Sequence, residues 1–376
     1  MNIPFIDLKA QFRVLESEIR SAIEAVLSHG QFIMGPEIGR LETELARFTG
    51  VKYALTCSSG TDALLLVLMA RGIGPGDAVF TSPFTFVATA EVIPLLGATP
   101  VFVDIDPITY NIDPEALGAA VEEVEKHGRL RPAAVIPVDL FGLPADYDPI
   151  MALASEKDLF VLEDAAQSFG GRYQGHMAGS LGHAGATSFF PAKPLGCYGD
   201  GGAVLTDDAE LDHRMRSIRV HGQGDNKYDN VRLGLNARMD TLQAAILLAK
   251  LTVFPQELEQ RQRAAQRYSR GLGGRLQVPT VPEGYYSAWA QYSVASERRE
   301  QIIAALKEAG VPTAIYYPKP LHLQGAFSNL GYAAGDFPQA ETAAGRIFSL
   351  PLHPYLDDEL IDRIVELVIT AGAEGK

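Results

Sequence analysis

Hydrophobic residues in the first half of the chain form short β-rich runs that alternate with segments of helical spacing. This alternation predicts an α/β fold with a mainly parallel sheet, because parallel neighbours are joined by crossover helices. The predicted strands are Tyr53–Cys57, Ala78–Ser82, Val101–Asp104, Ala133–Val138, Leu159–Glu163, Ala186–Phe189 and Ala203–Thr206. The predicted helices are Thr61–Arg71, Val87–Leu96, Pro114–Lys126 and Asp146–Glu156, with Gly72 and Gly97 as helix ends.

The second half of the chain begins with a long helical pattern from Asp240 that is interrupted at Pro255 and then resumes. A proline inside such a pattern predicts a bend, after which the chain leaves the first domain. Further on, the pattern predicts a strand over 290–294 and helices over 297–309, 338–348 and 357–371. We therefore expect a larger α/β domain over residues 1–250 and a smaller C-terminal α+β domain over residues 251–376.

The charge balance and the length of the apolar runs limit the possible partners. The 376 residues include 32 Lys and Arg against 46 Asp and Glu, and the net charge of −14 disfavours nucleic acid. The longest apolar run, Ala63 to Ala70, is far shorter than the roughly 20 residues of a membrane span. The N-terminus shows no charged-then-apolar signal pattern, so we expect a cytoplasmic protein without membrane contact.

Several common catalytic signatures do not occur in the sequence. The eight histidines form no HExxH pair or zinc-spaced cluster, so no metal site is predicted. Two cysteines are too few for an iron–sulfur cluster or a disulfide framework. There is no G-x-S-x-G elbow and no P-loop, and no G-x-G-x-x-G follows the first strand, which disfavours a nucleotide-dependent dehydrogenase.

Three segments place chemically useful side chains next to predicted strand ends. Lys193 follows the strand at 186–189, between aromatic residues and a glycine-rich turn. Asp164 ends the buried strand at 159–163, at the carboxyl edge where open α/β sheets bind ligands. Ser58 to Ala63 joins a strand to a helix, whose first N–H groups and dipole attract phosphate. Each has an ordinary alternative: a solvated lysine, and helix caps at the aspartate and the serines.

Together the three segments favour pyridoxal phosphate over a nucleotide. This cofactor needs an amine for a Schiff base, a carboxylate opposite its ring nitrogen and a phosphate-binding group. Lys193 supplies the amine and Asp164 the carboxylate, which keeps the pyridine nitrogen protonated so that the ring accepts electrons. The turn with Ser59 and Thr61 supplies the phosphate-binding group.

The chain resembles the DegT/DnrJ/EryC1/StrS sugar aminotransferases, which have fold type I of the pyridoxal phosphate enzymes. The resemblance spans nearly the whole chain, and the matching segments are Pro4–Lys9, Ser59–Thr61, Pro83–Thr89, Asp104–Asp106, Glu163–Ser168, the lysine segment and Gly234–Asp240. Similar dehydrating proteins carry histidine where this chain has Lys193, so the resemblance implies transamination. It also implies a homodimer whose active sites are shared between subunits.

The resemblance implies a role for each matching residue. Lys193 and Asp164 would be catalytic, with Lys193 bonded to the cofactor and Asp164 beside its ring nitrogen. Gln167 would lie beside the ring hydroxyl, and Phe86 would stack on the ring. The phosphate would be bound by Ser59, Gly60, Thr61 and Ser188, with Asn236 reaching it from the other subunit.

The substrate implied is a nucleotide-linked ketosugar, with glutamate as the usual amino donor. Segments such as PFIDLKAQF and SLPLHPYL most resemble enzymes for UDP-2-acetamido-2-deoxy-3-oxo-glucuronate in bacterial surface-polysaccharide synthesis. Arg238 could bind the sugar carboxylate with its two-donor fork, or form a salt bridge with Asp240 or Glu163. His221, Tyr316, Tyr317 and His322 are further predicted substrate contacts, although such residues also pack at domain borders.

Two alternatives remain open from the sequence. One is the same transamination on a neutral 3-keto or 4-keto deoxysugar linked to dTDP or UDP. The other is a pyridoxal phosphate-binding regulatory protein that has lost turnover, against which the joint presence of Lys193, Asp164 and Gln167 argues.

Overall fold

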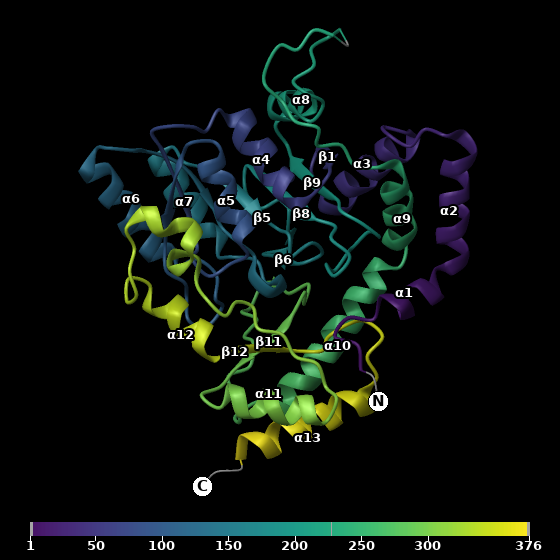
Figure 1. Ribbon diagram of the computed structural model, residues 1–376, viewed down its shortest axis with the longest axis vertical. Helices are drawn as coiled ribbons and strands as arrows, with labels where there is room; N and C mark the ends of the chain where they lie inside the picture. The colour runs from purple at the N-terminus through teal and green to yellow at the C-terminus, as the bar shows by residue number, and fades with distance from the viewer. Residues whose placement is uncertain (1–2, 227, 374–376) are drawn as a thin grey trace.

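A computed structural model describes residues 3–226 and 228–373 (Figure 1). Its centre is a 7-stranded sheet with the order β1-β9-β8-β5-β4-β2-β3. All seven strands lie within three residues of the segments predicted from the sequence. They are β1 (Tyr53–Cys57), β2 (Asp77–Thr81), β3 (Thr99–Phe102), β4 (Arg131–Ile136), β5 (Phe160–Asp164), β8 (Ala184–Ser188) and β9 (Gly202–Thr206).

Strand directions confirm a mainly parallel sheet with one antiparallel end. β2 pairs in parallel with β3 and β4, β4 with β5, and β5 with β8. β9 runs antiparallel between β8 and β1, with Ser188 opposite Gly202. The segment from residue 189 to 201 therefore leaves the sheet at the carboxyl end of β8, beside the carboxyl end of β5.

Helices cover both faces of the sheet. Phe80 packs in a cluster with residues of α6 and α7, whereas its neighbour Val79 packs with residues of α4 and α8 on the other face. Neighbouring strand residues point to opposite faces, and burial of both faces explains why the strands read as continuous apolar runs. The covering helices are α4 (Gly60–Arg71), α5 (Val87–Leu95), α6 (Pro114–His127), α7 (Tyr147–Lys157) and α8 (Ala209–Ile218).

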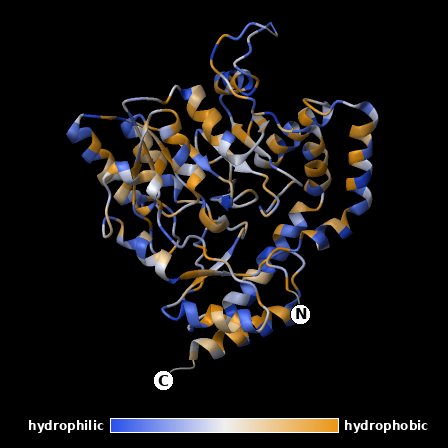
Figure 2. Ribbon diagram, in the orientation of Figure 1, coloured by the Kyte–Doolittle hydropathy of each residue, from blue (hydrophilic) through white to orange (hydrophobic). Residues whose placement is uncertain are grey.

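Helix α4 shows why the sequence starts and stops a helix at these points. Ser59 Oγ accepts a hydrogen bond from Asp62 N at 3.0 Å, which satisfies one of the free N–H groups of the first turn. Gly72 ends the helix at φ 71° in the left-handed region, as predicted. Figure 2 shows hydrophobic positions along most of α4, as expected for a helix packed between the sheet and α5 and α8.

The C-terminal part has its own hydrophobic core. α9 (Thr241–Leu251) and α10 (Phe254–Leu272) are separate helices, and Pro255 lies in the first turn of α10, which confirms the predicted interruption. Tyr268, Tyr292 and Ile361 belong to one buried cluster that also includes Ile3 near the N-terminus. The domain division at residue 250 remains a prediction. The other main elements here are β11 (Tyr292–Ala295), α11 (Arg299–Glu308), α12 (Pro338–Arg346), β12 (Ile347–Leu350) and α13 (Asp358–Ala373).

The C-terminal prediction was wrong in one detail, because the helix predicted over 338–348 ends at Arg346. Residues 347–350 are all buried and pair antiparallel with β11, so sheet pairing replaces the last helical turn.

Of the described residues, no helix is both long and apolar enough to cross a membrane. The remaining elements are α1 (Leu8–Val14), α2 (Glu16–His29), α3 (Pro36–Thr49), β6 (Arg172–Tyr173), β7 (His176–Met177), β10 (Tyr285–Tyr286) and short 3₁₀ turns at Leu140–Gly142, Leu321–Leu323 and Gly325–Leu330.

Candidate active site

Lys193 lies in a tight turn between β8 and β9. Its backbone N–H donates to the carbonyl of Phe190 at 2.9 Å, and the N–H of Cys197 donates to the carbonyl of Phe189 at 2.8 Å. The two bonds fold the segment back on itself soon after β8 ends. The lysine therefore occupies the predicted position, after a strand and before a glycine-rich turn.

Asp164 ends β5 and is 5% exposed. Its Oδ2 accepts from Thr89 Oγ1 at 2.7 Å, and its Oδ1 accepts from the N–H of Ala166 at 3.1 Å. The residues after it form a turn instead of a helix, so the alternative role as a helix cap does not apply. This strand end thus presents a buried carboxylate with both oxygens oriented.

Lys193 and Asp164 lie close enough to influence each other electrostatically. Burial raises the pKa of Asp164, while hydrogen bonds and the Lys193 ammonium oppose that rise. Burial also lowers the pKa of Lys193, and the carboxylate of Asp164 opposes that fall. The structure brings the two residues into one electrostatic site from positions 29 apart in the sequence.

Gln167 connects this site to Tyr317. Its Oε1 accepts from the N–H of Phe141 at 2.7 Å, and its Nε2 donates to the Tyr317 hydroxyl at 3.2 Å. The Tyr317 ring lies 6.4 Å from the ring of Phe86, measured between centroids. Phe86 precedes α5 and is 55% exposed, so an aromatic face stands open beside these polar groups.

The start of α4 and Ser188 form a compact group that can bind an anion. A Cβ on Gly60 would lie 2.7 Å from the Cβ of Ser188, so glycine permits this close approach. The first N–H groups of the helix have no acceptor one turn earlier. Ser59 accepts from Asp62 N and keeps its own O–H to donate, and Thr61 adds a second hydroxyl. Capping and anion binding are therefore compatible here.

The backbone between Asn236 and Arg238 passes the start of α4 in the same chain. The N–H of Ser58 donates to the carbonyl of Ala237 at 3.1 Å, and Arg238 Nε donates to Asn236 Oδ1 at 3.0 Å. Within residues 3–226 and 228–373, Arg238 forms no salt bridge with Asp240 or Glu163. The structure therefore does not support a salt bridge as the role of Arg238.

The other predicted substrate contacts have different surroundings. His221 is exposed, and its backbone N–H donates to the carbonyl of Leu235 at 2.8 Å, on the segment that leads to Asn236. The Tyr316 ring tilts against Phe5 at 6.4 Å. His322 is 2% exposed, with Nε2 3.1 Å from Glu341 Oε1. Its ring packs on Phe337, which is the packing role that the sequence left open.

Comparison with known proteins identifies the family. The sequence pattern of the DegT/DnrJ/EryC1/StrS aminotransferase family matches residues 13–369. The chain belongs to this family. A structure of a DegT/DnrJ/EryC1/StrS aminotransferase from Brucella abortus is 51% identical, with a TM-score of 0.97 over 99% of this chain and 100% of that one. Another, the PLP form of a sugar aminotransferase from Streptococcus pneumoniae, is 28% identical, with a TM-score of 0.90 over 99% of each chain.

Curated relatives of the aminotransferase cover nearly its whole length. UDP-2-acetamido-2-deoxy-3-oxo-D-glucuronate aminotransferase of Pseudomonas aeruginosa is 50% identical over 94% of this chain and 96% of that protein. A pleiotropic regulatory protein of Geobacillus stearothermophilus is 44% identical over 98% of each. UDP-N-acetyl-3-dehydro-alpha-D-glucosamine 3-aminotransferase of Acidithiobacillus ferrooxidans is 43% identical over 97% of each.

The aminotransferase uses pyridoxal phosphate, and the site fits this cofactor. Lys193 provides an amine and Asp164 a buried carboxylate, and each opposes the shift that burial causes in the other's pKa. The start of α4 and Ser188 provide N–H and O–H donors for a phosphate. The exposed ring of Phe86 offers a surface for the pyridine ring. These residues would hold the cofactor.

Two residues that support the aminotransferase site were missed from the sequence. Thr89 lies one helical turn after Phe86 and donates to Asp164, so helical spacing from the predicted aromatic residue could have identified it. Lys250 donates to the carbonyl of Gly196 in the Lys193 turn. Nothing in its apolar surroundings, TLQAAILLAKL, distinguishes it from a lysine at a helix end.

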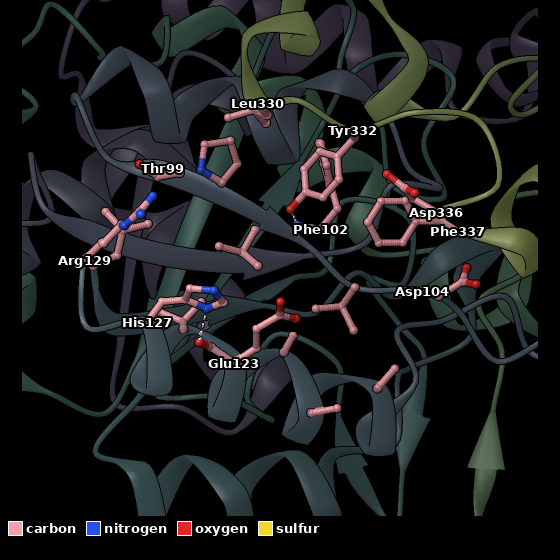
Figure 3. Close-up of a pocket in the computed structure, with 18 residues that line it drawn as sticks. Thr99, Phe102, Asp104, Glu123, His127, Arg129, Leu330, Tyr332, Asp336 and Phe337 are labelled. Atoms are coloured by element: carbon pink, nitrogen blue, oxygen red, sulfur yellow. Dashed lines mark hydrogen bonds between the residues drawn. The ribbon is translucent and has the colours of Figure 1, made fainter.

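A cavity of about 740 Å³ lies elsewhere, along the edge strand β3 (Figure 3). It is lined by β3, α6 and residues 330–337, and by none of the predicted site residues. Pro100 has no N–H to donate, and the N–H of Phe102 donates to the Tyr332 hydroxyl at 3.3 Å. The edge of β3 therefore disfavours pairing with a further strand. Because none of the predicted site residues line the cavity, it adds nothing to the site.

Proposed function

We propose that the protein transfers the amino group of glutamate to UDP-2-acetamido-2-deoxy-3-oxo-glucuronate in the cytoplasm, for bacterial surface-polysaccharide synthesis. The observation that carries this proposal is the joint placement of Lys193, Asp164 and the anion-binding group at the start of α4. The chain that holds them is 50% identical to an aminotransferase for that sugar. The test is to supply glutamate and the ketosugar and to identify the aminated product by mass.

The proposed mechanism assigns a task to each group at the site. When bound, pyridoxal phosphate accepts the electron pair left as a proton leaves the reacting carbon. Asp164 would hold a proton on the ring nitrogen, because a buried carboxylate favours a positive charge beside it. Thr89 keeps that carboxylate oriented. Lys193 would move the proton at the reacting carbon, and burial favours the neutral amine that this transfer needs by lowering its pKa.

A homodimer with shared sites is part of the same proposal. The segments 220–226 and 228–236 project from the body of the molecule after α8 (Figure 1). They expose Val231 and Leu233, which are 53% and 89% accessible. Phe190, close to Lys193, is also 52% exposed. Exposed apolar side chains near a site favour a subunit interface, and Asn236 lies at the base of the projecting segment.

Subunit mixing tests the shared site. If Asn236 serves the partner's site, Lys193→Ala and Asn236→Ala subunits are each inactive alone but form hybrids with one intact site. We expect hybrid dimers, isolated with two affinity tags, to recover part of the wild-type activity. Absence of activity in verified hybrids would place Lys193 and Asn236 in the site of one chain.

Arg238 is the proposed ligand of the sugar carboxylate. Its guanidinium is partly exposed, has no salt bridge to Asp240 or Glu163, and is oriented by Asn236. A planar fork can give two parallel hydrogen bonds to a carboxylate, which an ammonium group cannot. This supports a carboxylated sugar over the neutral 3-keto or 4-keto deoxysugar.

Substitution of Arg238 separates these two substrates. Arg238→Ala is expected to lower kcat/KM for the 3-oxo-glucuronate substrate by roughly 30-fold or more, because a carboxylate loses its partner in a partly dehydrated site. Arg238→Lys should recover only part of that loss. A neutral UDP-ketosugar is the control and should lose far less. Equal losses for both sugars would make Arg238 structural and remove the support for a carboxylated substrate.

The regulatory alternative gains no support from the site. Lys193, Asp164 and the anion-binding start of α4 are all retained at the site, and together they provide what turnover requires. Conversion of the bound cofactor's absorption spectrum to that of pyridoxamine phosphate on addition of glutamate would exclude this alternative directly.

A further inference from the structure

The turn that carries Lys193 is held by two side chains of α9. Lys250 Nζ donates to the carbonyl oxygen of Gly196 at 2.6 Å, and Gln243 Oε1 accepts from the N–H of Tyr198 at 2.8 Å. Positions 243 and 250 are about two helical turns apart, so both side chains leave the same face of α9. This face therefore contacts the turn at two backbone positions that follow Lys193.

Lys250 is an unusual residue for a buried helix face. It is 0% exposed, and its ammonium lies 4.0 Å from the centroid of the Tyr198 ring. Burial lowers its pKa to about 8, and Glu257 on α10 and Cys197 in the turn oppose that fall. Among the described residues, Lys250 forms no ion pair with a carboxylate within 4.0 Å. Burying an amine is costly, so a structural role alone would be served as well by methionine.

The carbonyl that Lys250 binds belongs to a constricted part of the turn. A Cβ on Gly196 would lie 2.6 Å from the carbonyl oxygen of Pro191 and 2.7 Å from that of Phe190. The carbonyl of Phe190 also accepts the backbone N–H of Lys193. The peptides before and after Lys193 are thus in contact, and a bond that fixes Gly196 restrains the lysine between them.

We propose that Lys250 is a positioning residue for the cofactor lysine: its bond to Gly196 and its contact with Tyr198 keep the turn in the conformation that presents Lys193. This inference rests on the proposed role of Lys193. It assigns Lys250 no contact with cofactor or substrate. Gln243 acts in the same way at the other end of the α9 face.

The test measures how fast apoprotein bonds added pyridoxal phosphate at Lys193, followed by absorbance and by the mass after borohydride reduction. Lys250→Met is expected to slow this capture about tenfold or more, because a hydrogen bond from a charged donor is lost. It should also lower kcat with little change in KM for the nucleotide sugar. Lys250→Arg should recover part of the rate, since a guanidinium can donate to Gly196 and stack on Tyr198.

The matched control is Ile361→Ala, a buried truncation in the C-terminal core. It should lower Tm yet leave the capture rate as in the wild type. Wild-type capture by folded Lys250→Met, at any Tm, would overturn the proposal. If Lys250→Met does not fold, Gln243→Ala carries the test, and normal capture by that variant would overturn it too. The mass of reduced wild-type protein checks the role of Lys193 separately.

Discussion

Replacement of Lys193 by alanine is expected to abolish transamination and leave the fold intact. The Lys193 amine is the group that bonds the cofactor covalently in the proposed mechanism, so turnover should fall to the uncatalysed background without it. The side chain lies in a turn, and its truncation removes little buried apolar area, so Tm should stay within a few degrees of the wild type. The measurement is product formation by mass, together with thermal unfolding.

Cofactor trapping provides the control for Lys193→Ala. Borohydride reduction should fix pyridoxal phosphate to the wild-type chain, at a peptide that contains residue 193, and should fix none at that position in the variant. Wild-type turnover by Lys193→Ala would refute the assignment. Trapping at another lysine would show that the covalent bond forms elsewhere in the chain.

Replacement of Asp164 by asparagine should reduce kcat by about 1,000-fold or more, since it removes a buried charge that stabilises the protonated ring nitrogen. The amide has nearly the same shape, and its oxygen can still accept a hydrogen bond from Thr89 or Ala166. The loss of kcat would therefore measure the effect of the carboxylate charge and not of side-chain packing. Steady-state rates with glutamate and the ketosugar measure it.

Thr89→Val is the matched control for Asp164→Asn. It removes the hydrogen bond to Oδ2 and leaves the carboxylate in place, so the expected loss is only about tenfold. If Asp164→Asn retained near-normal rates, Asp164 would have only the local role of accepting the N–H of Ala166.

Most of the central sheet could be predicted from the sequence because its strands are short apolar runs bounded by turn residues. β1 has the predicted bounds of 53–57. The antiparallel direction of β9 could not be predicted, because a strand buried on both faces reads the same in either direction. β12 was missed since its apolar residues continue the helical pattern of α12.

The chemical centre of the site could be predicted because Lys193 and Asp164 each stand at a strand end. Their supporting residues could not, because the contacts join distant parts of the chain. Thr89 reaches Asp164 across 75 positions, and Lys250 reaches Gly196 across 54. His322 was predicted as a substrate contact or a packing residue, and in the structure its ring packs on Phe337 in the interior. Residue type alone does not distinguish such a histidine from a substrate ligand.

The measurement that tests the central claim most directly is a donor and acceptor assay on the purified protein loaded with pyridoxal phosphate. Glutamate is supplied with UDP-2-acetamido-2-deoxy-3-oxo-glucuronate or with neutral UDP- and dTDP-ketosugars, and the products are identified by mass. The account predicts an aminated UDP-sugar acid and 2-oxoglutarate in equal amounts, with far lower turnover of the neutral sugars. Amination of none of the ketosugars, by a protein that carries the cofactor on Lys193, would contradict it.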